Sequence, residues 1–162
     1  MNGRVIFVAT LLASILTLAA STSAPAQVDP ASLAQRHVEA IARGDVAGAL
    51  TLYNDDAVMQ GAGLCAAAPC VGQAAIQKEL ERRVADKTHA TTIDKYVSGN
   101  VAVQQVEARS DSIQKSGVDR IILWTIYEVK GDKFAAATAA LQRTDPQTAR
   151  YLEWLRSQPP AR

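Results

Sequence analysis

The chain has 162 residues, with 17 lysines and arginines against 16 aspartates and glutamates, which gives a net charge of +1. This length suits a single domain with one hydrophobic core. A nearly neutral chain without a basic run offers no electrostatic footprint for nucleic acid, and it suits an anionic membrane surface no better. We therefore expect neither nucleic acid nor, after removal of the N-terminal segment, a membrane among its partners.

The N-terminal segment has the three parts of a secretory signal peptide. Arg4 provides a basic start, residues 5–20 are apolar and uncharged, and a stretch of small residues ends at Ala26. A membrane anchor is the alternative, but the apolar run is short for a span and no basic flank follows it. We expect cleavage between Ala26 and Gln27 and a periplasmic or secreted location. The mature chain would have 136 residues, with 16 basic and 16 acidic side chains.

Two helices and a short strand are predicted next. Residues 31–43 should form the first helix, because Asp29-Pro30 is a typical helix start and side chains of the buried stripe recur every fourth residue, at Leu33, His37 and Ile41. Residues 46–53 should form a short second helix, with Tyr53 on its apolar side. Residues 57–60 are predicted as a short strand.

The two cysteines, Cys65 and Cys70, lie in a loop rich in glycine and alanine. Outside the cytoplasm, two thiols this close in sequence usually form a disulfide bond, and two free thiols are the alternative. Neither histidine lies near them at ligand spacing, so we expect no metal site. Closing so small a ring stabilises the fold by only about 2 kcal/mol, so the bond should mainly shape the loop.

A third helix is predicted over residues 72–87. Its apolar stripe is formed by Ile76, Leu80 and Val84. Its other face carries charges of both signs at spacings of three to four residues, which is typical of a solvated helix face. These charged residues are Lys78, Glu79, Glu81, Arg82 and Arg83.

From His89 onward the pattern changes to strands. Turn signals separate runs rich in β-branched residues, which predicts an antiparallel meander over residues 91–97, 101–113, 118–129 and 134–141. Residues 121–126 are apolar on both faces, so their strand should be central. The last run is rich in alanine and could form a helix, but a turn precedes it and a helix start, Asp145-Pro146, follows it. A final helix is predicted over residues 148–157.

This order of elements is typical of an α+β domain whose helices cover one face of a curved sheet. We predict a sheet of about four long strands plus one short strand, wrapped by three N-terminal helices, with an extra C-terminal helix. The domain should occupy residues 27–158 and be followed by a tail, residues 159–162.

Three motifs in this order resemble a known family. They are Ala-Ile-Ala-Arg-Gly-Asp-Val at residues 40–46, Leu-Tyr-Asn-Asp-Asp-Ala-Val at residues 52–58 and Gly-Gln-Ala-Ala-Ile at residues 72–76. Together they resemble the SnoaL-like and ketosteroid isomerase-like branch of the nuclear transport factor 2-like superfamily, over about residues 32–141. The resemblance implies a cone-shaped sheet closed by helices around a cavity. The same cone serves enzymes, binding proteins and dimerisation modules, so it does not fix the function.

The chain departs from the residues that such isomerases use. Their aspartate base would fall within residues 58–62, which contain no carboxylate. Their first-helix tyrosine falls on His37, and their strand acid falls near Trp124 or Thr125. Without a general base, proton transfer next to a carbonyl has no agent. We therefore do not expect isomerase chemistry.

His37 is the candidate catalytic residue. Its neighbours one turn away are Leu33 and Ile41, so it should point inward, either as a core histidine or as a polar group facing the cavity that can exchange a proton near neutral pH. Side chains alternate along a strand, so Trp124 and Tyr127 cannot share a face. Of the two faces of that strand, we choose the more apolar one, which carries Ile122, Trp124 and Ile126, for the expected ligand pocket. The other expected pocket residues are His37, Tyr53 and Met59.

The alternating residues Glu107, Arg109 and Asp111 form either a solvated face or a polar cavity wall. No motif in the sequence demands a cofactor. The leading hypothesis is an exported domain that binds a small apolar or amphipathic molecule. One alternative is a lyase or isomerase that uses His37 as acid and base. The other is a homodimer whose sheet face is an interaction surface, without a ligand.

Overall fold

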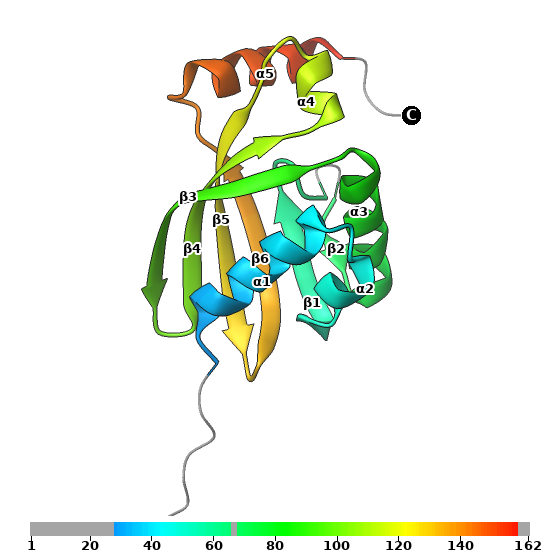
Figure 1. Cartoon of the computed structure of the whole chain (residues 1–162), viewed down its shortest axis with the longest axis vertical. Coiled ribbons are helices and arrows are strands. Elements are labelled where there is room, and N and C mark those ends of the chain that lie inside the picture. The colour runs from blue at the N-terminus through cyan, green and yellow to red at the C-terminus, as the bar shows by residue number, and fades with distance from the viewer. Residues whose placement is uncertain (1–27, 66–67, 159–162) are drawn as a thin grey trace, which may run out of the picture.

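The computed structural model describes residues 28–65 and 68–158 (Figure 1). The expected signal peptide, its cleavage site and the tail 159–162 lie outside these residues. The elements are α1 (Pro30–Ala42), α2 (Val46–Leu50), β1 (Tyr53–Gly61), β2 (Cys70–Val71), α3 (Gln73–Ala85), β3 (His89–Ser98), β4 (Val101–Arg109), α4 (Asp111–Lys115), β5 (Ile121–Lys130), β6 (Lys133–Leu141) and α5 (Pro146–Ser157). Within the described ranges, no helix is both long enough and apolar enough to cross a membrane.

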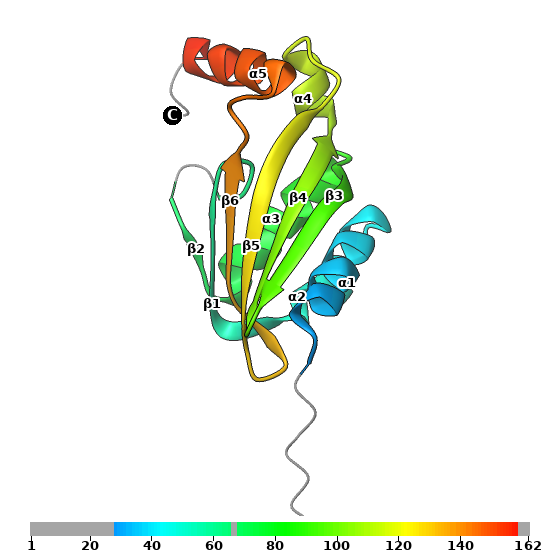
Figure 2. The same ribbon diagram turned by 90° about the vertical axis from the view of Figure 1, so that its left-hand side faces the viewer.

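The strands form one curved sheet in the order β2-β1-β6-β5-β4-β3 (Figure 2). The pairs β3–β4, β4–β5 and β5–β6 are antiparallel, which confirms the predicted meander. The pair β1–β6 is parallel and joins the first strand of the chain to the last. The register shifts between Thr92 and Asp94 in β3, and such a bulge bends and twists a strand. The predicted α+β architecture with a curved sheet is therefore confirmed.

Helices α1 and α3 cover one face of this sheet. Helix α1 begins after Asp29, whose carboxylate accepts hydrogen bonds from the backbone N–H groups of Ala31 and Ser32. It packs across β3, β4 and β5, whereas α3 packs on β1 and β2. Alternate residues of β4 are buried under this layer, beginning at Ala102. Helices α4 and α5 lie together at one end of the sheet (Figure 1).

Several predicted boundaries are wrong. The second helix ends at Leu50, and Tyr53 already belongs to β1, which is much longer than the predicted strand 57–60. The strand predicted over 101–113 ends at Arg109, because the Ser110 hydroxyl accepts a hydrogen bond from the backbone N–H of Ile113 and caps the short helix α4. The central position of residues 121–126 is confirmed, since β5 lies between β4 and β6.

Candidate functional site

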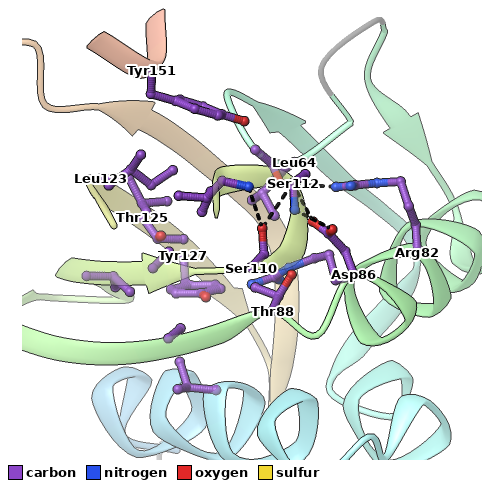
Figure 3. Close-up of a pocket in the computed structure, with 18 residues that line it drawn as sticks. Leu64, Arg82, Asp86, Thr88, Ser110, Ser112, Leu123, Thr125, Tyr127 and Tyr151 are labelled. Carbon is purple, nitrogen blue, oxygen red and sulfur yellow. Dashed lines mark hydrogen bonds between the residues drawn. The ribbon is translucent and has the colours of Figure 1, made fainter. Parts of the chain in front are cut away.

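A partly open cavity of about 80 Å³ lies where the inner face of the sheet meets α3, α4 and α5 (Figure 3). Its volume exceeds what one water molecule needs, so it has room for several waters or part of a small organic molecule. Its lining residues are Val38, Gly63, Leu64, Arg82, Arg83, Asp86, Thr88, Ala90, Val106, Ala108, Ser110, Ser112, Ile113, Ile121, Leu123, Thr125, Tyr127 and Tyr151.

The cavity wall from β5 consists of Ile121, Leu123, Thr125 and Tyr127, which alternate along the strand and so share one face, and Figure 3 labels the last three. The expected set, Ile122, Trp124 and Ile126, therefore lies on the opposite face. Helix α1 packs over the face that carries Tyr127, and this packing decides which face is inside.

None of the six expected pocket residues is among the lining side chains. Met59 is fully buried within the hydrophobic core. Tyr53 is also fully buried, and its ring packs against Phe134. Glu107 and Arg109 do not line the cavity either, and they pair with each other, with 2.8 Å between Arg109 Nη2 and Glu107 Oε1.

His37 lies behind the cavity wall rather than in it. It is buried, and its ring sits between two tyrosines: Nε2 is 3.2 Å from the Tyr53 hydroxyl and Nδ1 is 3.2 Å from the Tyr127 hydroxyl. Burial and, secondarily, the charge of Arg83 lower the pKa of His37 to about 3. Its imidazole is therefore neutral at physiological pH and touches the cavity only through Tyr127.

The hydrogen-bonded side chains of Tyr53, His37 and Tyr127 favour one arrangement of protons. A neutral imidazole carries one N–H and one acceptor nitrogen. The hydroxyl of Tyr53 has no other acceptor among the described residues, so leaving its proton unpaired would cost about 1–3 kcal/mol. The favoured arrangement has Tyr53 donating to Nε2 and the Nδ1–H donating to Tyr127. The O–H of Tyr127, a residue of the cavity lining, then has no acceptor among the described side chains.

Burial raises the pKa of Tyr127 to about 12, with the charge of Arg83 acting weakly in the opposite direction. The phenol is therefore protonated at physiological pH. Burial also raises the pKa of Tyr53. The pair Tyr127–His37 thus places a neutral phenol in a wall that combines apolar side chains with polar and charged ones.

Asp86 is the acidic residue of the lining. Its Oδ1 accepts from the Ser112 backbone N–H at 2.9 Å and its Oδ2 accepts from the Ser112 hydroxyl at 2.6 Å (Figure 3). Burial raises the pKa of Asp86, but hydrogen bonds from Ser112 and Ser110 outweigh it, and the net pKa is lowered. This carboxylate therefore ties α4 to the end of α3 and is a weak base.

Arg82 and Arg83 are site residues that the sequence interpretation assigned to a solvated face. Arg82 pairs with Glu79, with 2.8 Å from Nε to Oε2 and 2.6 Å from Nη2 to Oε1, and Glu79 is buried. Arg83 is half-buried and lines the cavity. It lies seven positions after Ile76 and three after Leu80, which is the spacing of one helix face, so helical periodicity could have identified it.

The disulfide between Cys65 and Cys70 is confirmed, with 5.7 Å between the Cα atoms. Cys70 begins β2, which pairs with β1, so the bond anchors the preceding loop to the sheet. That loop supplies Gly63 and Leu64 to the cavity wall. Across residues 28–65 and 68–158, no group of three or more histidine, cysteine, aspartate or glutamate side chains is placed to hold a metal ion.

Comparison with protein families assigns this fold and cavity to a class. The model of the SnoaL-like domain matches residues 34–146. The match covers more than half of the chain, so this protein belongs to the SnoaL-like family, and its architecture is that of the nuclear transport factor 2-like superfamily. A search of the curated proteins finds no match.

Solved structures share the fold at low sequence identity. A nuclear transport factor 2-like protein from Cytophaga hutchinsonii is 11% identical, with a TM-score of 0.58 over 72% of this chain and 93% of that one. SalBIII, an epoxide hydrolase/cyclase-like enzyme in pyran ring formation, is 12% identical, with a TM-score of 0.61 over 72% and 92%. A protein of ketosteroid isomerase-like fold from Catenulispora acidiphila, solved with trimethylamine, is 14% identical, with a TM-score of 0.55 over 67% and 83%. At these identities the similarity establishes the fold alone.

Proposed function

We propose that this protein is an exported domain that binds a small, largely apolar molecule in the cavity beside Tyr127, without the proton-transfer chemistry of ketosteroid isomerases. The observation that carries the proposal is the composition of the cavity wall. Apolar side chains such as Leu123 and Val106 line it together with polar groups, among them the phenol of Tyr127. A concave apolar wall with a few convergent polar groups is the usual form of a small-molecule site.

The absence of isomerase chemistry is supported by the state of the two candidate bases. His37 has both ring nitrogens engaged and a pKa of about 3, and it does not line the cavity. Asp86 lines the cavity, but both of its oxygens accept hydrogen bonds and its pKa is lowered. A general base works best when its pKa lies near the operating pH and the reacting proton is within reach. The lyase or isomerase alternative would need one of these groups to be released.

Native mass spectrometry of protein from its own host tests the binding proposal. Wild-type protein should carry a bound small molecule. Ala108→Phe, which places a ring in the cavity, should lose it while circular dichroism shows a retained fold. Ala47→Phe, on the exposed surface of α2, is the matched control and should keep the molecule. If Ala108→Phe keeps the bound molecule, the cavity is not the binding site.

A separate measurement tests the export part of the proposal. N-terminal sequencing of secreted protein should give Gln27 as the first residue.

A second candidate function, a homodimeric interaction module, is favoured by the sheet surface turned away from α1. We call this the outer face and define it by Tyr96, Val103, Trp124 and Ile126. Tyr96, Val103 and Ile126 are register partners on neighbouring strands, and the Tyr96 ring stacks with Trp124 at 6.3 Å. Tyr96 is 55% exposed and Ile126 37% exposed, so apolar area is available to a second copy.

A further inference from the structure

We propose that the ligand of this cavity carries a carboxylate, bound by the guanidinium of Arg83 and the hydroxyl of Tyr127. This inference rests on the proposed binding function and specifies its ligand class. The molecule would be a small carboxylic acid whose apolar part lies against the wall of β4 and β5.

The first argument is the position of Arg83. It lies on the side of α3 that carries the buried residues Ile76 and Leu80, and it lines the cavity. Its charge acts on three buried groups of the domain interior: it adds to the effect of burial that lowers the pKa of His37, and it opposes the larger effect of burial that raises the pKa of Tyr53 and of Tyr127. The guanidinium is therefore close enough to the aromatic cluster to act on it, rather than being fully screened by solvent.

The second argument is that Arg83 makes no ion pair or side-chain hydrogen bond with the described part of the chain, although its neighbour Arg82 does. Arg82 is neutralised by a two-point contact with Glu79. Both arginines lie in the last turn of α3, where the helix dipole favours a cation, so the dipole does not distinguish them. Arg83 is a half-buried residue of the cavity lining, and a carboxylate would give its guanidinium a partner of matching planar geometry.

The third argument is that Tyr127 supplies a second donor in the same cavity. Its hydroxyl accepts from His37 in the favoured arrangement and keeps its own proton for a ligand oxygen. Hydrogen bonds to an ionised oxygen are stronger than those between neutral groups. Asp86 also lines the cavity and would repel an anion, but both of its oxygens already accept hydrogen bonds from Ser112.

A carboxylate is favoured over a more highly charged group by the surroundings. Arg83 is the one basic lining residue without an acidic partner among the described residues, so it can neutralise a single negative charge. A doubly charged phosphate would leave one charge uncompensated beside apolar side chains, which is costly. A purely apolar ligand would instead leave the guanidinium without an acidic partner and the proton of the Tyr127 hydroxyl without an acceptor.

The test compares hexanoate with 1-hexanol, which have the same chain length and differ in charge. NMR chemical-shift titration of the full mature chain gives both affinities. Wild-type protein should bind hexanoate about tenfold more tightly than 1-hexanol, the magnitude of one charge-assisted contact. Arg83→Gln should remove this preference, so that the two probes bind with similar affinity. Arg36→Gln, which removes the same charge from the exposed side of α1, should keep the preference.

Each other outcome has a distinct meaning. Equal affinity for the two probes in wild-type protein, or a preference that survives in Arg83→Gln, overturns the carboxylate inference and leaves the proposed function standing. Failure of acids and alcohols of four to ten carbons alike to shift cavity resonances overturns both. Should Arg83→Gln not fold, the Nε resonance of Arg83 in wild-type protein gives the same decision, because hexanoate should shift it and 1-hexanol should not.

Discussion

The hydroxyl of Tyr127 lies 3.2 Å from Nδ1 of His37, so a side chain of the cavity wall is joined directly to one that is sealed in the core. Tyr53 continues this connection on the other side of the imidazole at the same distance. Because the three groups satisfy one another, a change in any of them affects stability and the hydrogen-bonding capacity of the cavity together.

Replacing His37 by Phe should reduce the free energy of unfolding. The substitution leaves the buried hydroxyl of Tyr53 without a partner, which costs about 1–3 kcal/mol. Urea unfolding monitored by circular dichroism measures the change. Tyr53→Phe combined with His37→Phe is the informative control, because removing both polar partners should recover part of the loss. Unchanged stability of the single variant would show that the Tyr53–His37 contact contributes nothing.

Stability should also depend on pH through His37. Its pKa in the folded state, about 3, lies below its ordinary value of 6.5, so the unfolded chain binds a proton more readily. The neutral imidazole therefore makes its full contribution to the free energy of unfolding above pH 6.5. As the pH falls toward 3, that free energy decreases by up to about 1.4 kcal/mol per pH unit. His37→Phe should flatten this part of the stability profile, whereas replacing His89, the exposed second histidine, by Gln should not.

Replacing Gln104 by Met should increase stability by about 1 kcal/mol. Gln104 is fully buried on β4, and neither Nε2 nor Oε1 has a hydrogen-bond partner among the described residues. Met has a similar shape and no amide to desolvate. The neighbouring Gln105 donates to Gln142, so Gln105→Met should give no such gain. Thermal unfolding of the two variants measures the change in stability that each substitution causes. A loss of stability in Gln104→Met would indicate that the amide of Gln104 has a hydrogen-bond partner in solution.

If the outer face joins two copies of the chain, Ile126→Glu should convert a dimer into a monomer in sedimentation velocity. The reason is that a symmetric interface would bury this position twice, with each carboxylate facing apolar area. Leu155→Glu, at an exposed position on α5, is the matched control and should leave the sedimentation coefficient unchanged. A monomeric wild-type protein at high micromolar concentration would contradict the homodimer.

The sequence predicted the fold better than the site, and individual residues show why. The spacing of Leu33, His37 and Ile41 fixed the inner side of α1, and turn signals located the meander. Residues 121–126 are apolar on both faces, so alternation alone could not tell that Leu123 rather than Trp124 lines the cavity. That choice depends on which face α1 covers, which is tertiary information.

Charged residues were the second source of error. Arg83 was assigned to the solvated face because opposite charges lie three to four residues apart on that helix, although its spacing from Ile76 places it with the buried residues. The early end of the second helix has a similar cause. Tyr53 suits a helix stripe, but its backbone is needed by the parallel pairing with Phe134 in β6.

The parallel pairing of β1 with β6 also determines when this protein can fold. Tyr53 pairs with Phe134, and Gly61 pairs with Ala139. Because these partners lie far apart in the sequence, this strand pairing forms only after nearly the whole domain has left the ribosome. Until then β1 can pair only with the two-residue strand β2 and exposes an open edge. Contacts of such sequence separation slow folding. A nascent chain would therefore lack its complete sheet through most of its synthesis, which is compatible with the export proposed above.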